Sequence, residues 1–172
     1  IEESIENQKF EHVQIKLDSL FQDAIDIVRE PATKKGVTVT LSGQATSIGD
    51  APALLQMALR LINNSLTYTP HGGRVTISVR DHHNHSSIEV NDTGIGIPDF
   101  ALKDIFKPFY RINTPEHQAV KGGGLGLAIV KLIVDAHKGH LDVESSYGKG
   151  AKFTIRLPHT HTGEQYVIPT QS

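Results

Sequence analysis

Three stretches of the chain carry apolar residues at the three- or four-residue spacing of an amphipathic helix. They cover residues 17–36, 54–68 and 125–136, and in each one the apolar positions fall on a single face. The second stretch follows Asp50 and Pro52, which suit the N-cap and the first turn of a helix. The pattern therefore predicts three helices that each bury one face.

Five shorter stretches have the alternation of apolar and polar residues, or the β-branched content, that is typical of strands with one buried face. We expect strands at Val37–Leu41, Arg74–Arg80, Ser86–Val90, His140–Ser145 and Lys152–Leu157. Together with the three helices, these strands indicate one α/β unit.

The ends of the chain and one internal segment lie outside this pattern. Residues 1–16 are interpreted as the end of a charged helix from a preceding domain and its linker, residues 17–158 as the α/β domain, and residues 159–172 as a frayed tail. Residues 100–121 lack a strong period, so we expect them to form a mobile lid.

Composition excludes several classes of protein. The chain has 172 residues, which suits one domain with its own core, and it lacks cysteine, so neither a disulfide nor a thiolate metal site can form. Its 17 basic and 19 acidic residues give no basic excess for binding nucleic acid. The longest apolar run, residues 125–134, is far too short to span a bilayer.

A first candidate binding motif, Asp92-Thr93-Gly94-Ile95-Gly96-Ile97, follows the strand expected at Ser86–Val90. A carboxylate at such a turn can accept a hydrogen bond from the exocyclic amine of adenine. The two glycines allow a positive φ and let a flat ligand lie against the backbone. Taken alone, the motif also fits an ordinary strand-to-loop turn.

A second candidate, Gly122-Gly123-Gly124-Leu125-Gly126-Leu127, leads into the third predicted helix. Free backbone N–H groups and the helix dipole make a helix N-terminus a site for phosphate. The spacing of the glycines matches neither the dinucleotide-binding pattern nor the P-loop. The alternative is a hinge that binds no ligand.

A third candidate is Asn64, at the edge of the apolar stripe of the second predicted helix. Arg60 lies one turn before it and Tyr68 one turn after it. The side-chain carbonyl of an asparagine can bind Mg²⁺, which prefers oxygen ligands together with waters and phosphates. A solvent-facing asparagine is the alternative.

Five motifs, in this order and spacing, resemble those of sensor histidine kinases. They are similar to the family's N box, first glycine box, F box, second glycine box and final glycine turn, at Asn64, 92–97, Phe106-Lys107-Pro108-Phe109-Tyr110-Arg111, 122–127 and Gly148-Lys149-Gly150-Ala151. The resemblance, from about Leu17 to Pro158, implies the ATP-binding catalytic domain, with the fold of gyrase, Hsp90 and mismatch-repair ATPases. That fold is an α/β (α+β) two-layer sandwich. About three helices cover one face of a mixed, mainly antiparallel sheet of about five strands, and an ATP lid is attached.

The resemblance also implies cofactors and residue roles. ATP and Mg²⁺ are the expected cofactors, with Asp92 on adenine and with Asn64 on the metal as a catalytic residue. Arg60 is expected to be a second catalytic residue, although it departs from the family pattern. The other residues expected at the nucleotide are Tyr68, Gly94, Gly96, Ile97, Lys107, Arg111, Gly122, Gly123, Gly124, Leu125, Gly126 and Leu127. Within the lid, the aromatic residues of the F box are expected to dock when ATP binds, which would bring Lys107 and Arg111 to the phosphates.

Two positions depart from the family pattern. Arg60 stands where the N box usually has Asn, His, Asp or Glu, and Thr67 stands where it usually has Lys. Phosphoryl transfer depends on neutralising charge around the γ-phosphate, so these changes can either tune or disable it. Arg60 can also restore the charge that is lost at Thr67.

The chain lacks the His-Glu-x-x-Thr-type motif that receives the phosphoryl group, since His12 is followed by Val13-Gln14-Ile15. We therefore expect that histidine on a helix upstream of Ile1, in a dimerisation and phosphoacceptor domain. The other implied partners are a response regulator and a second copy of the full-length protein, and no nucleic acid is expected. The expected location is the cytoplasm, including as the cytosolic part of a membrane-anchored sensor.

Three functions compete at this point. A protein histidine kinase is favoured by the ordered motifs. A degenerate nucleotide-binding module that regulates a partner is the alternative raised by Arg60 and Thr67. A hydrolase of the gyrase or Hsp90 type needs a general base where this chain has Arg60, and a cation cannot accept the proton.

Overall fold

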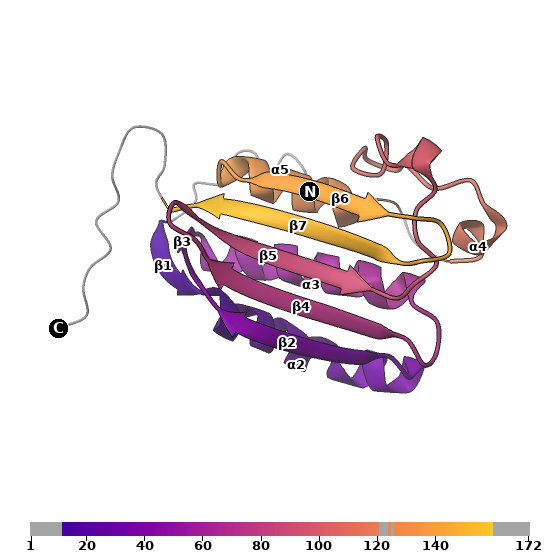
Figure 1. Ribbon diagram of the computed structural model, residues 1–172, viewed down its shortest axis with the longest axis horizontal. Coiled ribbons are helices and arrows are strands. Elements are labelled where there is room, and N and C mark those ends of the chain that lie inside the picture. The colour runs from indigo at the N-terminus through magenta and orange to yellow at the C-terminus, as the bar shows by residue number, and fades with distance from the viewer. Residues whose placement is uncertain (1–11, 121–123, 125, 160–172) are drawn as a thin grey trace.

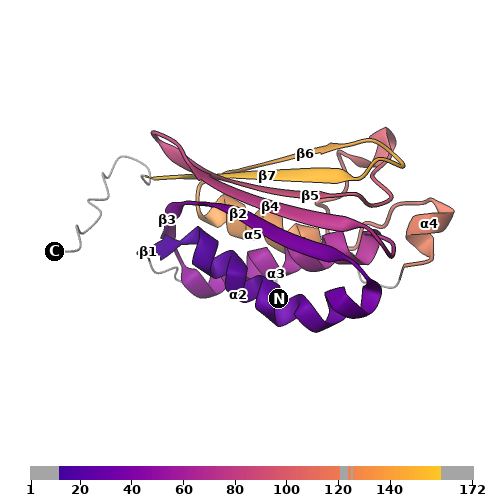
Figure 2. The ribbon, with the colours of Figure 1, turned by 60° about the horizontal axis from the view of Figure 1, so that its bottom comes forward.

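The computed structural model describes residues 12–120, 124 and 126–159. These residues form a sheet layer and a helix layer (Figures 1 and 2). The elements are β1 (Val13–Lys16), α2 (Leu17–Lys35), β2 (Thr38–Gln44), β3 (Thr46–Gly49), α3 (Ala51–Tyr68), β4 (Arg74–Asp81), β5 (His85–Asp92), η1 (Asp99–Ala101), α4 (Pro115–Gln118), α5 (Gly126–Ala136), β6 (His140–Ser145) and β7 (Ala151–Pro158).

The main sheet confirms the predicted architecture. Its strand order is β2-β4-β5-β7-β6, with β2 and β4 parallel and every other neighbouring pair antiparallel. Helices α2, α3 and α5 all cover the same face, as Figure 2 shows from below. The five predicted strands and three predicted helices therefore all exist, with ends shifted by a few residues at most.

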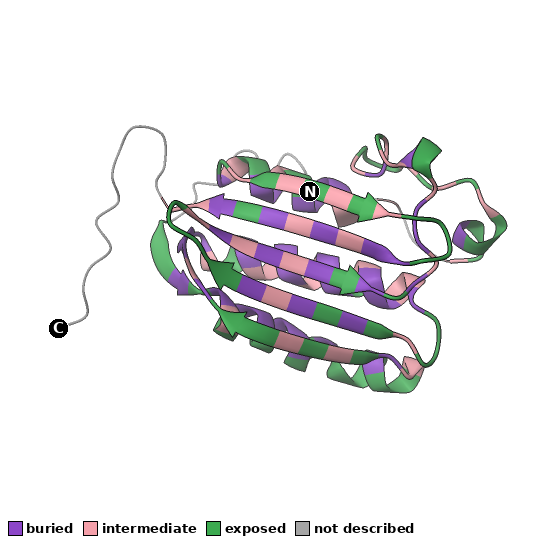
Figure 3. Ribbon diagram, viewed as in Figure 1, coloured by how far each residue is buried: buried purple, intermediate pink, exposed green. Residues whose placement is uncertain are grey.

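The core lies between the sheet and these helices. Ile77 and Val90 are opposite each other on β4 and β5, and both are fully buried against the helix layer. Intervening residues face solvent, so burial alternates along the strands (Figure 3). Removal of this apolar surface from water is the main stabilising contribution to such a fold.

Predicted signals explain where two helices begin and end. The Asp50 side chain accepts a hydrogen bond from the Ala53 N–H at 3.0 Å, which caps α3, and Pro52 occupies its first turn. Helix α2 ends at Gly36, whose φ of 71° is in the left-handed region that favours glycine. Both ends match the sequence-based expectation.

A small second sheet corrects the predicted domain boundary. Strand β1 pairs antiparallel with β3, and Ile15 is buried in the core. The folded unit therefore begins before Leu17, within the segment interpreted as a linker. Each of the two strands has only four residues, the shortest length at which alternation can indicate a strand. Residues 1–11 and 160–172, interpreted as a helix end and a tail, lie outside the described residues.

The lid projects from the end of the sheet where β5 ends (Figure 1). It contains turns, the short η1 and the four-residue helix α4, which the sequence did not predict. Phe106 packs edge-on against Phe153, with ring centroids 6.3 Å apart, whereas Phe109 is 70% exposed.

Among the described helices, none is long and apolar enough to cross a membrane.

Candidate functional site

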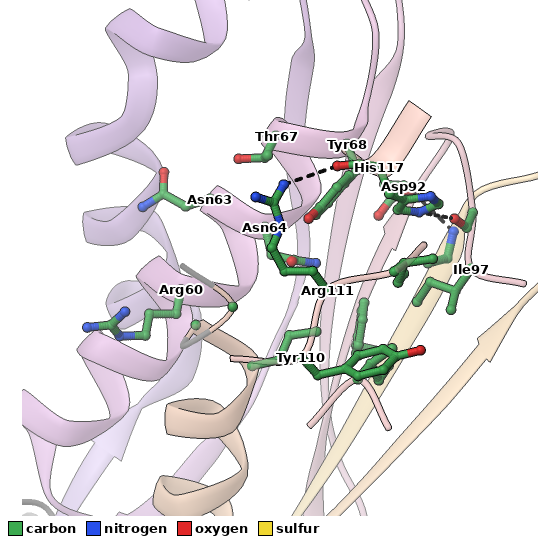
Figure 4. A pocket seen from close by; sticks show the side chains of 18 residues that line it. Arg60, Asn63, Asn64, Thr67, Tyr68, Asp92, Ile97, Tyr110, Arg111 and His117 are labelled. Atoms are coloured by element: carbon green, nitrogen blue, oxygen red, sulfur yellow. Dashed lines mark hydrogen bonds between the residues drawn. The ribbon is translucent and has the colours of Figure 1, made fainter. Parts of the chain in front are cut away.

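A cavity of about 380 Å³ lies between α3, the end of β5, the lid and the start of α5 (Figure 4). Its volume is in the range of small-molecule sites. The predicted site residues that line it are Arg60, Asn64, Tyr68, Asp92, Gly96, Ile97, Arg111, Gly124, Gly126 and Leu127. Four motifs that are far apart in the sequence therefore meet at one cavity.

Asp92 is the last residue of β5 and is only 6% exposed. Its Oδ1 accepts hydrogen bonds from the backbone N–H of Gly94 at 2.9 Å and of Ala151 at 3.2 Å. Burial raises the pKa of the Asp92 carboxyl, and these two hydrogen bonds and the side chain of Ser65 oppose the rise. Because both backbone bonds are made by Oδ1, Oδ2 keeps its capacity to accept a proton donor from a ligand.

The glycines after Asp92 also have a packing role in the fold. Gly96 has a φ of 75°, as predicted, but an added Cβ would lie 2.1 Å from the carbonyl oxygen of Ser146. A Cβ on Gly94 would lie 2.5 Å from the Tyr68 carbonyl oxygen, and Gly94 does not line the cavity. Both glycines thus permit close packing of backbone on backbone. Gly96 also lines the cavity, and its contact with a flat ligand stays a prediction.

Helix α3 places Asn64 and Tyr68, both half-buried, along one wall of the cavity. Arg60 lies one turn earlier, and its Nε is buried with no hydrogen-bond partner in the part of the chain that the structure describes. Figure 4 shows Arg60 at the opposite end of the cavity from Asp92, Ile97 and His117. A buried donor without a partner costs about 1–3 kcal/mol, a cost that a ligand oxygen would relieve.

The two lid cations that were expected at the phosphates differ in position. The guanidinium of Arg111 lines the cavity and donates to the carbonyl oxygens of His117, at 3.3 Å, and of Val120. Lys107 lies outside the cavity lining and pairs with Asp104 at 2.6 Å. The structure therefore brings Arg111 to the site but not Lys107, whose role at the phosphates stays a prediction.

The second glycine motif is only partly described. Gly124 has a φ of 75°, and its carbonyl oxygen accepts a hydrogen bond from the Phe109 N–H at 3.1 Å. Helix α5 begins at Gly126, so the motif does precede a helix N-terminus at the cavity. Gly122, Gly123 and Leu125 lie outside the described residues.

Four polar residues of the cavity were not among the predicted site residues. They are Asn63, Thr67, Tyr110 and His117 on α4, which is the most buried of the four. The side chain is 3% exposed, and both ring nitrogens have partners, the Gly96 carbonyl oxygen at 3.0 Å and the Thr114 hydroxyl at 2.5 Å. Thr114 before Pro115 is an N-cap signal that could have indicated α4. Nothing local, however, indicates the contact with Gly96.

Sequence reasoning also missed the apolar wall of the cavity. In addition to Ile97 and Leu127, this wall contains Ile105, Ile112 and Phe153, contributed by the lid and β7. Apolar walls with a single buried carboxylate suit a flat heteroaromatic ring that carries an exocyclic amine.

The described residues contain no cluster of three or more histidine, aspartate or glutamate side chains that could hold a metal ion. The protein therefore offers no complete metal cage in this part of the chain. Mg²⁺ bound by one or two protein oxygens, with phosphates and waters as the remaining ligands, is compatible with this arrangement.

Comparison with known proteins identifies the family. Residues 49–161, more than half of the chain, match the family model described as histidine kinase-, DNA gyrase B-, and HSP90-like ATPase. The sensor histidine kinase RppB of Synechocystis sp. is 44% identical over 117 residues, which are 68% of this chain and 26% of RppB. AtsR, a sensor histidine kinase of Burkholderia thailandensis, is 33% identical over 159 residues, or 88% of this chain and 26% of AtsR. The chain thus spans about a quarter of the length of each relative.

Similarity in structure agrees with the similarity in sequence. The mycobacterial sensor histidine kinase MprB matches with a TM-score of 0.73 and 28% identity, over 86% of this chain and 97% of the MprB chain. The chain therefore belongs to the family of histidine kinase-, DNA gyrase B- and HSP90-like ATPases, as an ATP-binding catalytic domain of the sensor histidine kinase type.

Proposed function

We propose that this chain binds ATP with Mg²⁺ in the cavity of Figure 4 and is the catalytic part of a sensor histidine kinase. In this role it transfers the γ-phosphate to a histidine on a helix of another domain. The main support is the convergence of Asn64, Asp92, Gly96 and Gly126 on one cavity, although they come from three separate motifs.

The two ends of the cavity suggest the orientation of ATP. Asp92 and the apolar wall favour the adenine ring at one end, where Oδ2 would accept from the amino group. Arg60 and the N-terminus of α5 favour the phosphates at the other end, because a cation and free backbone N–H groups both attract anions. Guanine carries a carbonyl in place of that amino group, so this arrangement selects against GTP.

Asn64 is the residue that would hold Mg²⁺, since its side-chain amide lines the cavity between these two ends. When bound, Mg²⁺ would neutralise phosphate charge and orient the γ-phosphate. Arg60 would add a second positive charge by turning its guanidinium, which Figure 4 shows directed away from Asn64, toward the phosphates. We propose that Arg60 takes the place of the lysine that the N box usually has at the position of Thr67.

Phosphoryl transfer makes modest chemical demands on the protein. A nitrogen of the acceptor imidazole forms a bond to the γ-phosphorus, while the bond from that phosphorus to the β–γ bridging oxygen breaks and ADP leaves. The acceptor imidazole becomes positively charged as the N–P bond forms, and the proton of its other nitrogen then passes to water. The ATP-binding chain itself mainly has to position the γ-phosphate and neutralise its charge. A water-activating base is absent at position 60, which favours transfer over hydrolysis.

The partners follow from the same proposal. The acceptor histidine would lie on a dimerisation and phosphoacceptor domain, the full-length protein would be a homodimer, and a response regulator would receive the phosphoryl group next. These steps take place in the cytoplasm, where ATP is available. The names of RppB and AtsR support this assignment, and both relatives are much longer than this chain.

The test is incorporation of phosphate from γ-labelled ATP by the longer protein that contains the phosphoacceptor helix. We expect label that is stable in alkali and lost in acid, as phosphohistidine is. A variant in which the acceptor histidine is replaced by Ala should carry none. ATP binding without any such label would contradict the kinase and favour the regulatory module instead.

A further inference from the structure

A small polar and aromatic cluster attaches helix α4 of the lid to the end of the cavity where adenine is proposed to bind. Its centre is His117, whose Nε2 lies 3.0 Å from the carbonyl oxygen of Gly96. A carbonyl oxygen can only accept, so Nε2 carries the proton and donates. The other nitrogen, Nδ1, then accepts from the hydroxyl of Thr114 in the neutral imidazole, at 2.5 Å.

Two aromatic rings lie close to the imidazole. The ring of Tyr68 on α3 has its centroid 5.4 Å from that of His117. The ring of Tyr147, from the turn between β6 and β7, has its centroid 6.2 Å from that of His117. The hydroxyl of Tyr147 donates to the carboxylate of Glu116, the neighbour of His117 on α4. The lid thus contacts α3, the loop after β5 and the turn between β6 and β7 at the same point.

These contacts involve the parts of the chain that form the adenine end of the site, beside Asp92. Gly96 and Tyr68 line the cavity beside Asp92, and His117 lines it with them. Tyr147 and Glu116 do not line the cavity, so they hold the lid from outside. A lid that is attached here therefore borders the end of the cavity where the adenine ring is proposed to bind.

We propose that His117 is a positioning residue of the nucleotide site, which fastens the lid to the Gly96 loop and so slows the release of bound nucleotide. This inference rests on the proposed function, because it assumes that the ligand of the cavity is ATP. It adds a contact outside the five sequence motifs, contributed by a residue of the otherwise aperiodic lid.

The bonds of the cluster suggest how large the effect is. Opening the lid breaks the buried hydrogen bond from His117 to Gly96 and the charge-assisted bond from Tyr147 to Glu116. Loss of one such bond typically accelerates a dissociation step by about fivefold to tenfold. Loss of the whole cluster should therefore accelerate nucleotide release by about tenfold or more.

The experiment measures how fast an ATP analogue with a fluorescent ribose substituent leaves the 172-residue chain when it is displaced by excess ATP. His117→Ala should release it about tenfold faster than the parent, and His117→Gln, which keeps a donor for Gly96, should fall between the two. Tyr147→Phe removes only the external bond to Glu116, should fold normally, and should release the analogue several-fold faster. His83→Ala, on the exposed turn between β4 and β5, is the matched control and should behave as the parent.

The outcomes separate the two proposals. Equal release rates in the parent, His117→Ala and Tyr147→Phe would overturn the proposed role of His117 in holding the lid and leave the proposed function intact. Faster release in Tyr147→Phe alone would also overturn it, because His117 would then not be the residue that holds the lid. Failure of the parent to bind the analogue or ATP would overturn the proposed function, and with it the proposed role of His117.

Discussion

Asn64 and Arg60 lie one helical turn apart on α3, and their expected contributions to nucleotide binding differ in kind. Asn64 offers a neutral oxygen to a metal, whereas Arg60 offers a buried N–H donor and a positive charge. The two roles can be separated experimentally, because only the first depends on Mg²⁺.

Replacement of Asn64 by Ala should remove most of the Mg²⁺ dependence of ATP affinity. Mutation of even an indirect metal contact typically lowers affinity about 10- to 100-fold, so we expect Mg·ATP binding to weaken by at least about tenfold. Asn91→Ala, at an exposed position of β5, is the control. Calorimetry with and without Mg²⁺ makes the measurement. The same Mg²⁺ dependence in Asn64→Ala and the parent would rule out the ligand role.

Replacement of Arg60 by Ala should lower the rate of phosphate transfer in the longer protein by about 10- to 100-fold, the usual value of a charge-assisted hydrogen bond. Adding Thr67→Lys to this variant should restore part of the rate, since it returns a cation to the N box. The rate is followed as acid-labile label from γ-labelled ATP. If Arg60→Asn is instead faster than the parent, Arg60 obstructs the active geometry.

At the scale of elements, the site depends on two helices, α3 and α5, being held at a fixed spacing. His137, which follows α5, is buried and connects them. Its Nδ1 donates to the Ile133 carbonyl oxygen at 2.8 Å, and its Nε2 accepts from the Asp50 N–H at 3.1 Å. The imidazole thus links the end of α5 to the N-cap of α3.

His137→Leu should lower the free energy of unfolding by about 1–3 kcal/mol, since it leaves buried polar groups of both helices without this partner. Urea denaturation measures the change. The control is His140→Leu, at an exposed position of β6, which should change stability by less than about 0.5 kcal/mol. An equal effect of both substitutions would show that His137 is not a link between the helices.

The lid attachment should weaken in acid. Burial lowers the pKa of His117, although the Gly96 carbonyl and the nearby Glu116 carboxylate oppose this shift. The attached state therefore favours the neutral imidazole. The contribution of His117 is complete above its ordinary value of about 6.5 and is lost progressively as the pH falls below it.

The expected result is that analogue release from the parent accelerates between pH 7.5 and pH 5.5 relative to release from His117→Gln. Other groups near His117 that titrate or carry charge are Glu116, Tyr147, Tyr68, Arg111 and Asp92. They are present in both proteins, as are the phosphates of the analogue, so the ratio of the two rates isolates the histidine. Parallel pH profiles would contradict the attachment.

At the scale of the whole molecule, local signals predicted the sandwich and its main elements. Asp50, Pro52 and the apolar period are sufficient to define α3, because caps and packing faces are encoded within one helix. Strands β1 and β3 were not predicted, because each is only four residues long and their pairing joins segments at least thirty residues apart.

The site was predictable to the same extent and for the same reason. Asp92 and Asn64 belong to motifs with a recognisable order, and the structure places both at the cavity. The contact of His117 with Gly96 and the packing of Gly96 on Ser146 join segments that meet only in the folded chain. Contacts between segments that are distant in the sequence can be identified only from the three-dimensional arrangement.

The central claim is that Asp92 reads adenine in this cavity, and calorimetric titration of the 172-residue chain with ATP and GTP tests it most directly. We expect ATP to bind in the presence of Mg²⁺ and GTP to bind at least about tenfold more weakly. Asp92→Ala should weaken ATP binding by about 1–3 kcal/mol and remove the preference, whereas Asp23→Ala, on the exposed face of α2, should leave both unchanged. Equal affinity of the parent for ATP and GTP, or an Asp92→Ala variant that retains the preference, would contradict the account.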